Sequence, residues 1–136
     1  MNLQLSWHNN YSVNIIDIDK EHKWLFDEIE KFQTAIGKKT SHEILGEILK
    51  SLKSYSTCHF NTEEELMLKY NYPHYKEHVA QHQFFISVIE KIRQRFENGK
   101  MVLVIELICF LKEWLKQHIE MADKAYSHFF NECGIH

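Results

Sequence analysis

Four long segments of this chain carry apolar residues at every third or fourth position, the period of an α-helix that buries one face. The segments run over about residues 20–36, 41–70, 73–97 and 101–130. The chain has 136 residues but only one Pro and four Gly, which is too few for a turn-rich β protein. We therefore predict an all-α protein with four helices.

Short polar connections join the predicted helices. Gly37 is expected to end the first helix, Thr40 with Glu43 matches a capping box for the second, and Asn98-Gly99 ends the third. Short connections favour antiparallel neighbours, so we predict an up-down-up-down antiparallel four-helix bundle. The chain length fits one domain over residues 1–136.

Residues 1–19 show no helical period, but they are too apolar for a disordered tail. Trp7, Tyr11 and Val13 lie in this stretch, and we expect an ordered N-terminal arm that packs on the bundle. Asp17 and Asp19 are candidate caps for the helix that follows.

Charge and composition exclude several classes of protein. Lys plus Arg is 16 and Asp plus Glu is 19, so the net charge of −3 gives no basic surplus for nucleic acid. The most apolar stretch is too short for a membrane span, and the first residues lack the basic and apolar regions of a secretory signal, so we expect neither a membrane span nor secretion. Three Cys without a C-x-x-C pair indicate a reducing compartment. We expect a cytoplasmic monomer with no nucleic-acid or membrane partner.

The ten histidines decide the functional prediction, because several fall on the apolar stripes of the helices. In the second helix, for example, a stripe through Leu52 and Tyr55 continues to His59, Glu63 and Leu66. Positions that the pattern reserves for apolar side chains thus hold five His and one Glu: His22, His59, Glu63, His78, His82 and His118.

These inward polar residues are expected to meet at one height along the bundle. His22 lies about 14 residues before the end of its helix, and His59 about 18 residues after the start of the next. At about 1.5 Å per residue, these two distances differ by only about 6 Å. A lone inward histidine is usually an ordinary core residue, but a whole layer of imidazoles and carboxylates requires a cation.

Asp123 is the seventh candidate for this layer. It follows His118 at i+5, which is about 140° around an ideal α-helix. A single π-type turn would bring both residues to the same face, and such turns are frequent at functional sites. His74 shares the spacing of His78 and His82, but it follows Pro73 directly, so we predict a rim position for it.

The motifs D-K-E-H-K-W-L-F, H-F-N-T-E-E-E-L-M, H-V-A-Q-H-Q-F-F and W-L-K-Q-H-I-E-M-A-D resemble those of bacterial single-domain hemerythrins. The resemblance extends over nearly the whole chain and implies a non-haem di-iron centre. One iron would be held by His78, His82 and His118, and the other by His22 and His59. Glu63 and Asp123 would bridge the two irons together with an oxo or hydroxo group, which leaves one coordination position open.

By the same resemblance, that open position would bind dioxygen reversibly, for oxygen storage, delivery or buffering. Phe60, Trp114, Leu115 and Ile119 would line an apolar pocket around it; the alternative for these four residues is plain core packing, and both roles are compatible. We expect a binding protein and not an enzyme. The alternatives are an oxygen or redox sensor with a separate partner, and a di-iron enzyme that handles peroxide or nitric oxide.

Overall fold

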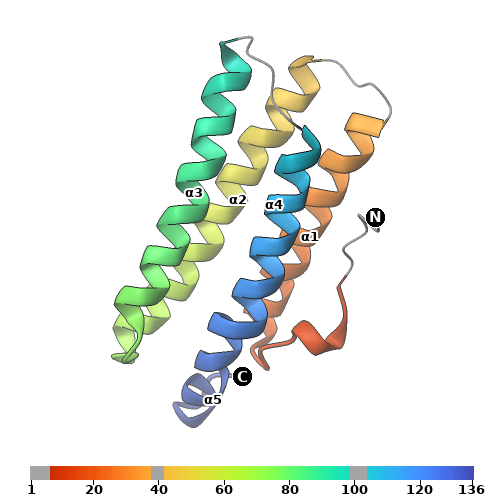
Figure 1. The fold of residues 1–136 in the computed structure, drawn as a ribbon. Coiled ribbons are helices and arrows are strands. Elements are labelled where there is room, and N and C mark those ends of the chain that lie inside the picture. The colour runs from red at the N-terminus through yellow and green to blue at the C-terminus, as the bar shows by residue number, and fades with distance from the viewer. Residues whose placement is uncertain (1–6, 38–41, 99–103) are drawn as a thin grey trace.

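The computed structural model describes residues 7–37, 42–98 and 104–136, and it confirms the predicted all-α bundle. Four long helices lie side by side and alternate in direction (Figure 1). They are α1 (Ile16–Gly37), α2 (His42–Lys69), α3 (Tyr75–Glu97) and α4 (Val104–Gln117). No strand occurs among the residues just given, and none of their helices is long and apolar enough to cross a lipid bilayer.

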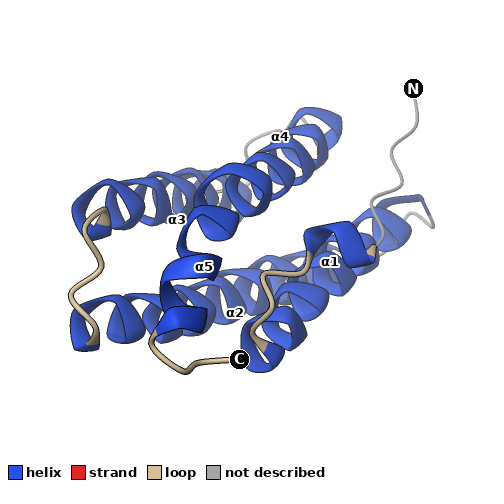
Figure 2. Cartoon of the chain, turned by 90° about the horizontal axis from the view of Figure 1, so that it is seen from below, coloured by secondary structure: helices blue, strands red, loops and turns tan. Residues whose placement is uncertain are grey.

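Two short elements follow α4 and complete the fourth side of the bundle. The π-helical turn η2 (His118–Asp123) continues α4 directly, and α5 (Lys124–Glu132) ends the fold. Figure 2, which views the bundle from below, shows α5 at the same end as the start of α1. The predicted fourth helix is therefore continuous in path, but it changes its helical type in the middle.

The arm is shorter than predicted, because α1 begins at Ile16 and not near residue 20. The backbone of Asn14 has a φ of 58°, a left-handed conformation that turns the chain just before the helix. Asp19, in the first turn of α1, holds the arm by hydrogen bonds. Its carboxylate accepts hydrogen bonds from the Val13 N–H at 2.9 Å and from the Ser12 hydroxyl at 2.6 Å.

The described part of the arm is anchored by aromatic and backbone contacts. The ring centroid of Trp7 lies 5.9 Å from that of Phe26, and the ring of Tyr11 lies 5.3 Å from the same residue. The Ser127 hydroxyl donates to the backbone carbonyl of Val13 at 2.5 Å. The arm therefore contacts both the first helix, α1, and the last helix, α5.

The remaining predicted boundaries are nearly correct. Pro73 lies in the turn before α3, whose N-cap is the exposed His74. The capping box of Thr40 and Glu43, Gly99, and the predicted start of the fourth helix at residues 101–103 lie outside what the structure describes.

The core is divided into two apolar clusters by the polar layer. The cluster on one side of it, the upper cluster, contains Tyr11, Leu25, Phe26, Ile29, Leu49, Leu52, Phe60, Phe85, Ile89, Leu111, Leu115 and Ile119. The cluster on the other side, the lower cluster, contains Val13, Ile15, Ile18, Met67, Tyr72, Tyr126 and Phe130. Each cluster packs all four sides of the bundle against one another, so the polar layer is sealed from both ends.

The buried stripe of α2 differs slightly from the predicted one. Tyr55 is 40% exposed and its ring contacts Trp24, while Ser56 takes the buried position. Leu66 is half-buried and Met67 is fully buried. The two stripes coincide at Leu52, His59 and Glu63. They differ only in where the steps of three and four residues fall, because both steps lie close to the 3.6 residues of a helical turn.

Asp19 provides a test of how the arm is attached. Asp19→Ala removes the acceptor for two hydrogen bonds that hold residues 12–14, and bonds to charged groups contribute roughly 1.5–3 kcal/mol each when well formed. Because the site is only partly buried, we expect the free energy of unfolding to fall by about 1–2 kcal/mol. Urea unfolding should show this loss, whereas the exposed Asp17→Ala should change the midpoint little; equal effects would contradict the assignment.

Candidate metal centre

The structure brings all seven predicted residues together in one buried layer. Each side of the bundle contributes at least one of them, and none is more than 4% exposed. The set consists of His22 from α1, His59 and Glu63 from α2, His78 and His82 from α3, and His118 and Asp123 from η2. Ionisable groups at this depth are found only when they are paired or bind a metal.

The π-helical turn explains how Asp123 reaches the layer. The segment from His118 to Asp123 is π-helical, so its wider turn places these two residues on the same face. His118 Nε2 lies 3.1 Å from Asp123 Oδ1, and the Asp123 side chain is fully buried. The predicted local change of helical type is therefore confirmed.

The inward atoms form two donor sets that share both carboxylates. One set contains five donors, from Glu63, His78, His82, His118 and Asp123. The other contains four, from His22, His59, Glu63 and Asp123. Within each set the donor atoms lie within 4.8 Å of one another, which is the spacing of ligands around one ion. The arrangement can hold two cations side by side, with the carboxylates between them.

The orientation of the His82 and His118 rings suits a cation between them. The Nδ1 of His82 donates to the Glu64 carboxylate at 2.8 Å, and the Nδ1 of His118 donates to the Gln81 side-chain oxygen at 2.8 Å. A neutral imidazole has only one N–H, so in the neutral form of each ring the Nε2 carries a lone pair that faces into the layer. The two Nε2 atoms lie 3.1 Å apart and would repel each other unless a positive ion lay between their lone pairs.

The four-donor side shows the same orientation. The Nδ1 of His59 donates to Glu21 at 2.9 Å, which turns its Nε2 toward the Glu63 carboxylate at 2.6 Å. His22 Nε2 lies 2.9 Å from Asp123 Oδ2. Nitrogen and carboxylate oxygen atoms thus converge on this side as well.

The electrostatics of the metal-free layer reflect this crowding of donors. Burial alone lowers the pKa of His59, but the charge of Glu63 and the hydrogen bonds that the ring donates to Glu21 and Glu63 raise it to about 10. Burial likewise lowers the pKa of His78, but its bonds to Asp123 and Glu63 raise it to about 9. In the absence of metal, protons on these two rings therefore take the place of cations beside the carboxylates.

The other members of the layer are shifted in the opposite direction. Burial lowers the pKa of His82 to about 3 despite the charge of Glu63. The ring is therefore neutral, and the lone pair of its Nε2 is available to bind a cation. Burial raises the pKa of Asp123, but the charge and hydrogen bond of His118, with bonds from His22 and His78, hold it well below its ordinary value. Asp123 is thus an ionised carboxylate although it is fully buried.

Buried polar atoms provide the test of whether metal fits this site. Within the described residues, the oxygens of Glu63 and Asp123 and the Nε2 atoms of His22 and His78 are buried, and their polar contacts are only with other members of the layer. Such atoms are costly unless something binds them. All of them belong to the two donor sets, so the residues present fit a two-cation centre.

Outer partners of the rings were not predicted from the sequence. Glu21, Glu64 and Gln81 orient His59, His82 and His118, as second-layer residues commonly do around metal-binding histidines. Their sequence positions carry no signal of this role, because each contact joins two different helices.

Tyr126 is a further residue beside the layer that the sequence analysis did not identify. Its buried hydroxyl has no hydrogen bond among the described residues. Burial together with the charges of Asp123 and Glu63 raises its pKa well above the ordinary value.

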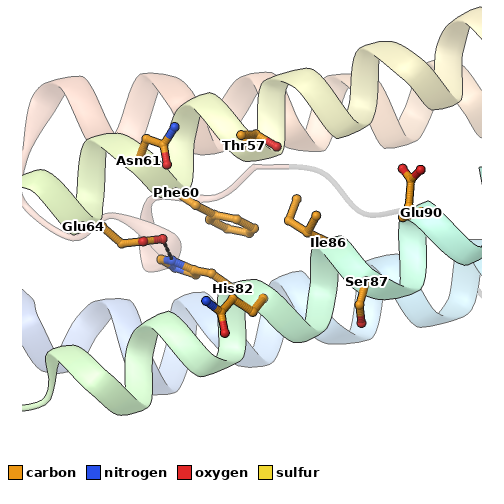
Figure 3. Close-up of a pocket in the computed structure, with 9 residues that line it drawn as sticks. Thr57, Phe60, Asn61, Glu64, His82, Ile86, Ser87 and Glu90 are labelled. Carbon is orange, nitrogen blue, oxygen red and sulfur yellow. Dashed lines mark hydrogen bonds and ion pairs between the residues drawn. The ribbon is translucent and has the colours of Figure 1, made fainter.

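A hollow of about 460 Å³ between α2 and α3 reaches the edge of the layer (Figure 3). Glu64 and Phe60 stand on one wall and His82 on the other, and the Glu64–His82 hydrogen bond closes the inner end. The ring of Phe60 stacks on that of His82 with centroids 3.9 Å apart. The hollow therefore exposes the outer partner of the histidine to solvent, while the ring itself stays 2% exposed.

The four predicted pocket residues lie next to the layer on the side of the upper cluster. Phe60, Leu115 and Ile119 are buried there, and Trp114 is half-buried. Trp114 stacks on the ring of His118 with centroids 4.4 Å apart. Phe60 and Trp114 thus support imidazoles of the five-donor set, in addition to any role as pocket walls.

The other histidines lie away from the layer. His74, His8, His128 and His136 are exposed, and the side chain of His42 is outside the described residues. The three cysteines are free, and Cys58 is exposed. The predicted rim position of His74 is confirmed.

Comparisons with known proteins agree with this geometry. The family model for the hemerythrin HHE cation binding domain matches residues 14–128. The bacteriohemerythrin of Stenotrophomonas maltophilia (strain R551-3) is 31% identical over 125 residues, covering 90% of this chain and 79% of that protein. Myohemerythrin-1 of Phascolopsis gouldii is 28% identical over 120 residues, covering 88% and 89%.

Solved structures show the same likeness in three dimensions. A wild-type hemerythrin crystal structure superposes with a TM-score of 0.85 at 28% identity, covering 91% of this chain and 95% of that one. The crystal structure of a hemerythrin variant, in which a leucine is replaced by tyrosine, gives a TM-score of 0.87 at 25% identity, covering 93% of this chain and 97% of that one. With the family model spanning most of its length and a matching fold, the chain belongs to the hemerythrin family.

Proposed function

We propose that this chain binds dioxygen reversibly at a non-haem di-iron centre. The observation that carries the proposal is the unequal pair of donor sets, five atoms on one side and four on the other, sharing two carboxylates. A solvent-derived oxo or hydroxo bridge would complete the five-donor side at six ligands and leave the other with five. The four-donor side thus keeps one position for a small ligand.

Two irons per chain are the metals that suit these ligands best. Imidazole suits iron among other transition metals, and carboxylates readily bridge a pair of ions. A structural zinc site is closed by four ligands in a tetrahedron, which seven converging residues exceed. In our assignment His78, His82 and His118 hold one iron, His22 and His59 the other, and Glu63 with Asp123 bridge them.

The bound irons would supply the electrons that make dioxygen binding possible and reversible. The chain's own residues would hold the ions, fix the imidazole rings through Glu21, Glu64 and Gln81, and exclude water. Phe60, Trp114, Leu115 and Ile119 are placed to form the apolar wall. Such a site serves storage, delivery or buffering of oxygen rather than turnover of a substrate.

All seven donors come from a single chain, so the centre needs no second copy, and we propose that the protein acts as a monomer. Cys58, Cys109 and Cys133 are free, which is compatible with the reducing environment of the cytoplasm. We place the protein there.

Absorption spectroscopy of the anaerobically reduced protein, together with an iron count, tests the proposal. We expect two irons per chain and a charge-transfer band that appears with oxygen and disappears under vacuum. One metal per chain, or mostly zinc, would contradict the di-iron assignment. Rapid irreversible oxidation with release of peroxide would instead favour a sensor or an enzyme.

Three consecutive glutamates provide a matched test of the ligand assignment. Glu63→Ala removes a shared carboxylate and should abolish the dinuclear centre. Glu64→Ala removes only the partner of His82 and should keep both irons with affinity weakened by roughly 10–100-fold. Glu65 is exposed, so Glu65→Ala should behave as wild type in an iron titration. Equal loss in all three variants would show that the assigned register is wrong.

His74 and His78 are four residues apart on α3 and form a second matched pair. His74 is exposed at the N-cap, whereas His78 belongs to the five-donor set. We expect His74→Ala to retain iron and oxygen binding, and His78→Ala to lose both. Metal analysis checks this directly, and an iron-free His74→Ala protein would overturn the assignment.

Leu115 tests the apolar wall. Leu115→Ala should leave the iron content near two but accelerate autoxidation of the oxygenated protein, because water and protons would enter more easily. The lost packing of a side chain that is 2% exposed should also lower the free energy of unfolding by about 2–5 kcal/mol. If the variant retains iron and fold but autoxidises at the wild-type rate, Leu115 is only a core residue.

A further inference from the structure

Ser56 is a fully buried polar residue that the fold does not use. Its side chain is 0% exposed, and its hydroxyl oxygen has no hydrogen-bond partner among the described residues. The other buried serine, Ser127, shows the usual solution, since its hydroxyl donates to the Val13 carbonyl. A buried hydroxyl without a partner is unfavourable, so Ser56 is better explained by a partner that binds there.

The position of Ser56 follows from the pairing of α1 and α2. The rings of His22 and His59 lie 4.5 Å apart, and those of Trp24 and Tyr55 lie 5.6 Å apart. These two antiparallel contacts place Leu25 opposite Ser56. Ser56 therefore lies one helical turn from His59, at the boundary between the polar layer and the upper cluster.

The surroundings at this level are apolar. Leu25, Phe60 and Leu115 belong to the upper cluster and are at most 3% exposed. Ser56 lies on the same inward stripe of α2 as Leu52 and His59, all of them buried. Its hydroxyl is thus a hydrogen-bond donor in an apolar setting, on the helix that supplies His59 to the four-donor set.

We propose that the Ser56 hydroxyl donates a hydrogen bond to a small ligand in the open position of the four-donor side. The inference rests on the proposed function. Ser56 is then a specificity residue, which favours short ligands whose second atom accepts a hydrogen bond, such as dioxygen or linear anions. A monatomic ligand has no second atom to extend toward a residue one turn away.

Anion titrations of the diferric protein test this role, with azide and fluoride as probes. Ser56→Ala should weaken azide binding by about fivefold, the effect of one net hydrogen bond. Fluoride binding should be unchanged, because fluoride cannot reach Ser56. Ser56→Thr keeps the hydroxyl and should restore most of the azide affinity.

Thermal unfolding of the metal-free variants separates this role from a structural one. Ser56→Ala removes a hydroxyl without a partner, so its Tm should equal or exceed that of wild type. Ser127→Ala breaks an existing bond and should lower the Tm. A clear drop for Ser56→Ala would identify a structural residue and overturn the proposal.

The outcomes also distinguish this inference from the proposed function. Unchanged azide affinity in Ser56→Ala, or an equal weakening of azide and fluoride, would refute the role of Ser56 while leaving the di-iron centre intact. A wild-type protein that takes up no iron, or that binds neither anion, would refute the proposed function and this inference with it.

Discussion

Two buried carboxylates, Glu63 and Asp123, lie between imidazoles from opposite sides of the bundle, and the rest of the structure is arranged around them. Glu63 contacts His59 and His78, and Asp123 contacts His22 and His78. Fully buried charges of this kind are unfavourable alone. Protonated imidazoles stabilise them in the metal-free layer, and the cations of the proposed centre would do so when bound. The two apolar clusters keep water away from both ends of the layer.

The orientation of the imidazoles is set from outside the layer. Glu21, Glu64 and Gln81 each accept the Nδ1 proton of one ring, which leaves the Nε2 lone pairs facing inward. The acceptors are partly accessible, as the hollow beside Glu64 shows, while the rings are not (Figure 3). The hydrogen bonds that orient the imidazole rings are thus accessible to solvent, whereas the rings that would bind metal are buried.

The two sides of the layer differ because the helices contribute unequally. Helix α3 supplies two histidines one turn apart and η2 adds a third, whereas α1 and α2 supply one histidine each. In the proposed centre, the side next to α1 and α2 is therefore the one that keeps a position for a ligand. Ser56 lies on this side, where the upper cluster meets the polar layer.

Sequence periodicity determined the four helices, the bundle and the identity of the inward polar residues, because burial of one helical face leaves a repeat that can be read directly. It even predicted a π-helical turn from the spacing of His118 and Asp123. It placed the end of the arm wrongly, since the conformation of Asn14 and the bonds of Asp19 carry no period. The stripe through Tyr55 was one position off because steps of three and of four residues both lie close to one helical turn, and the pattern alone does not choose between them.

Only the tertiary structure decided which donors share a side and which residues support them. Glu64 and Gln81 occupy positions that look like ordinary solvated surface, and their contacts cross from one helix to another. The sequence also could not show that Ser56 lacks a partner, because an unsatisfied hydroxyl is a property of everything packed around it. Local repeats specify faces of helices, but the pairing of those faces depends on how four helices fit together.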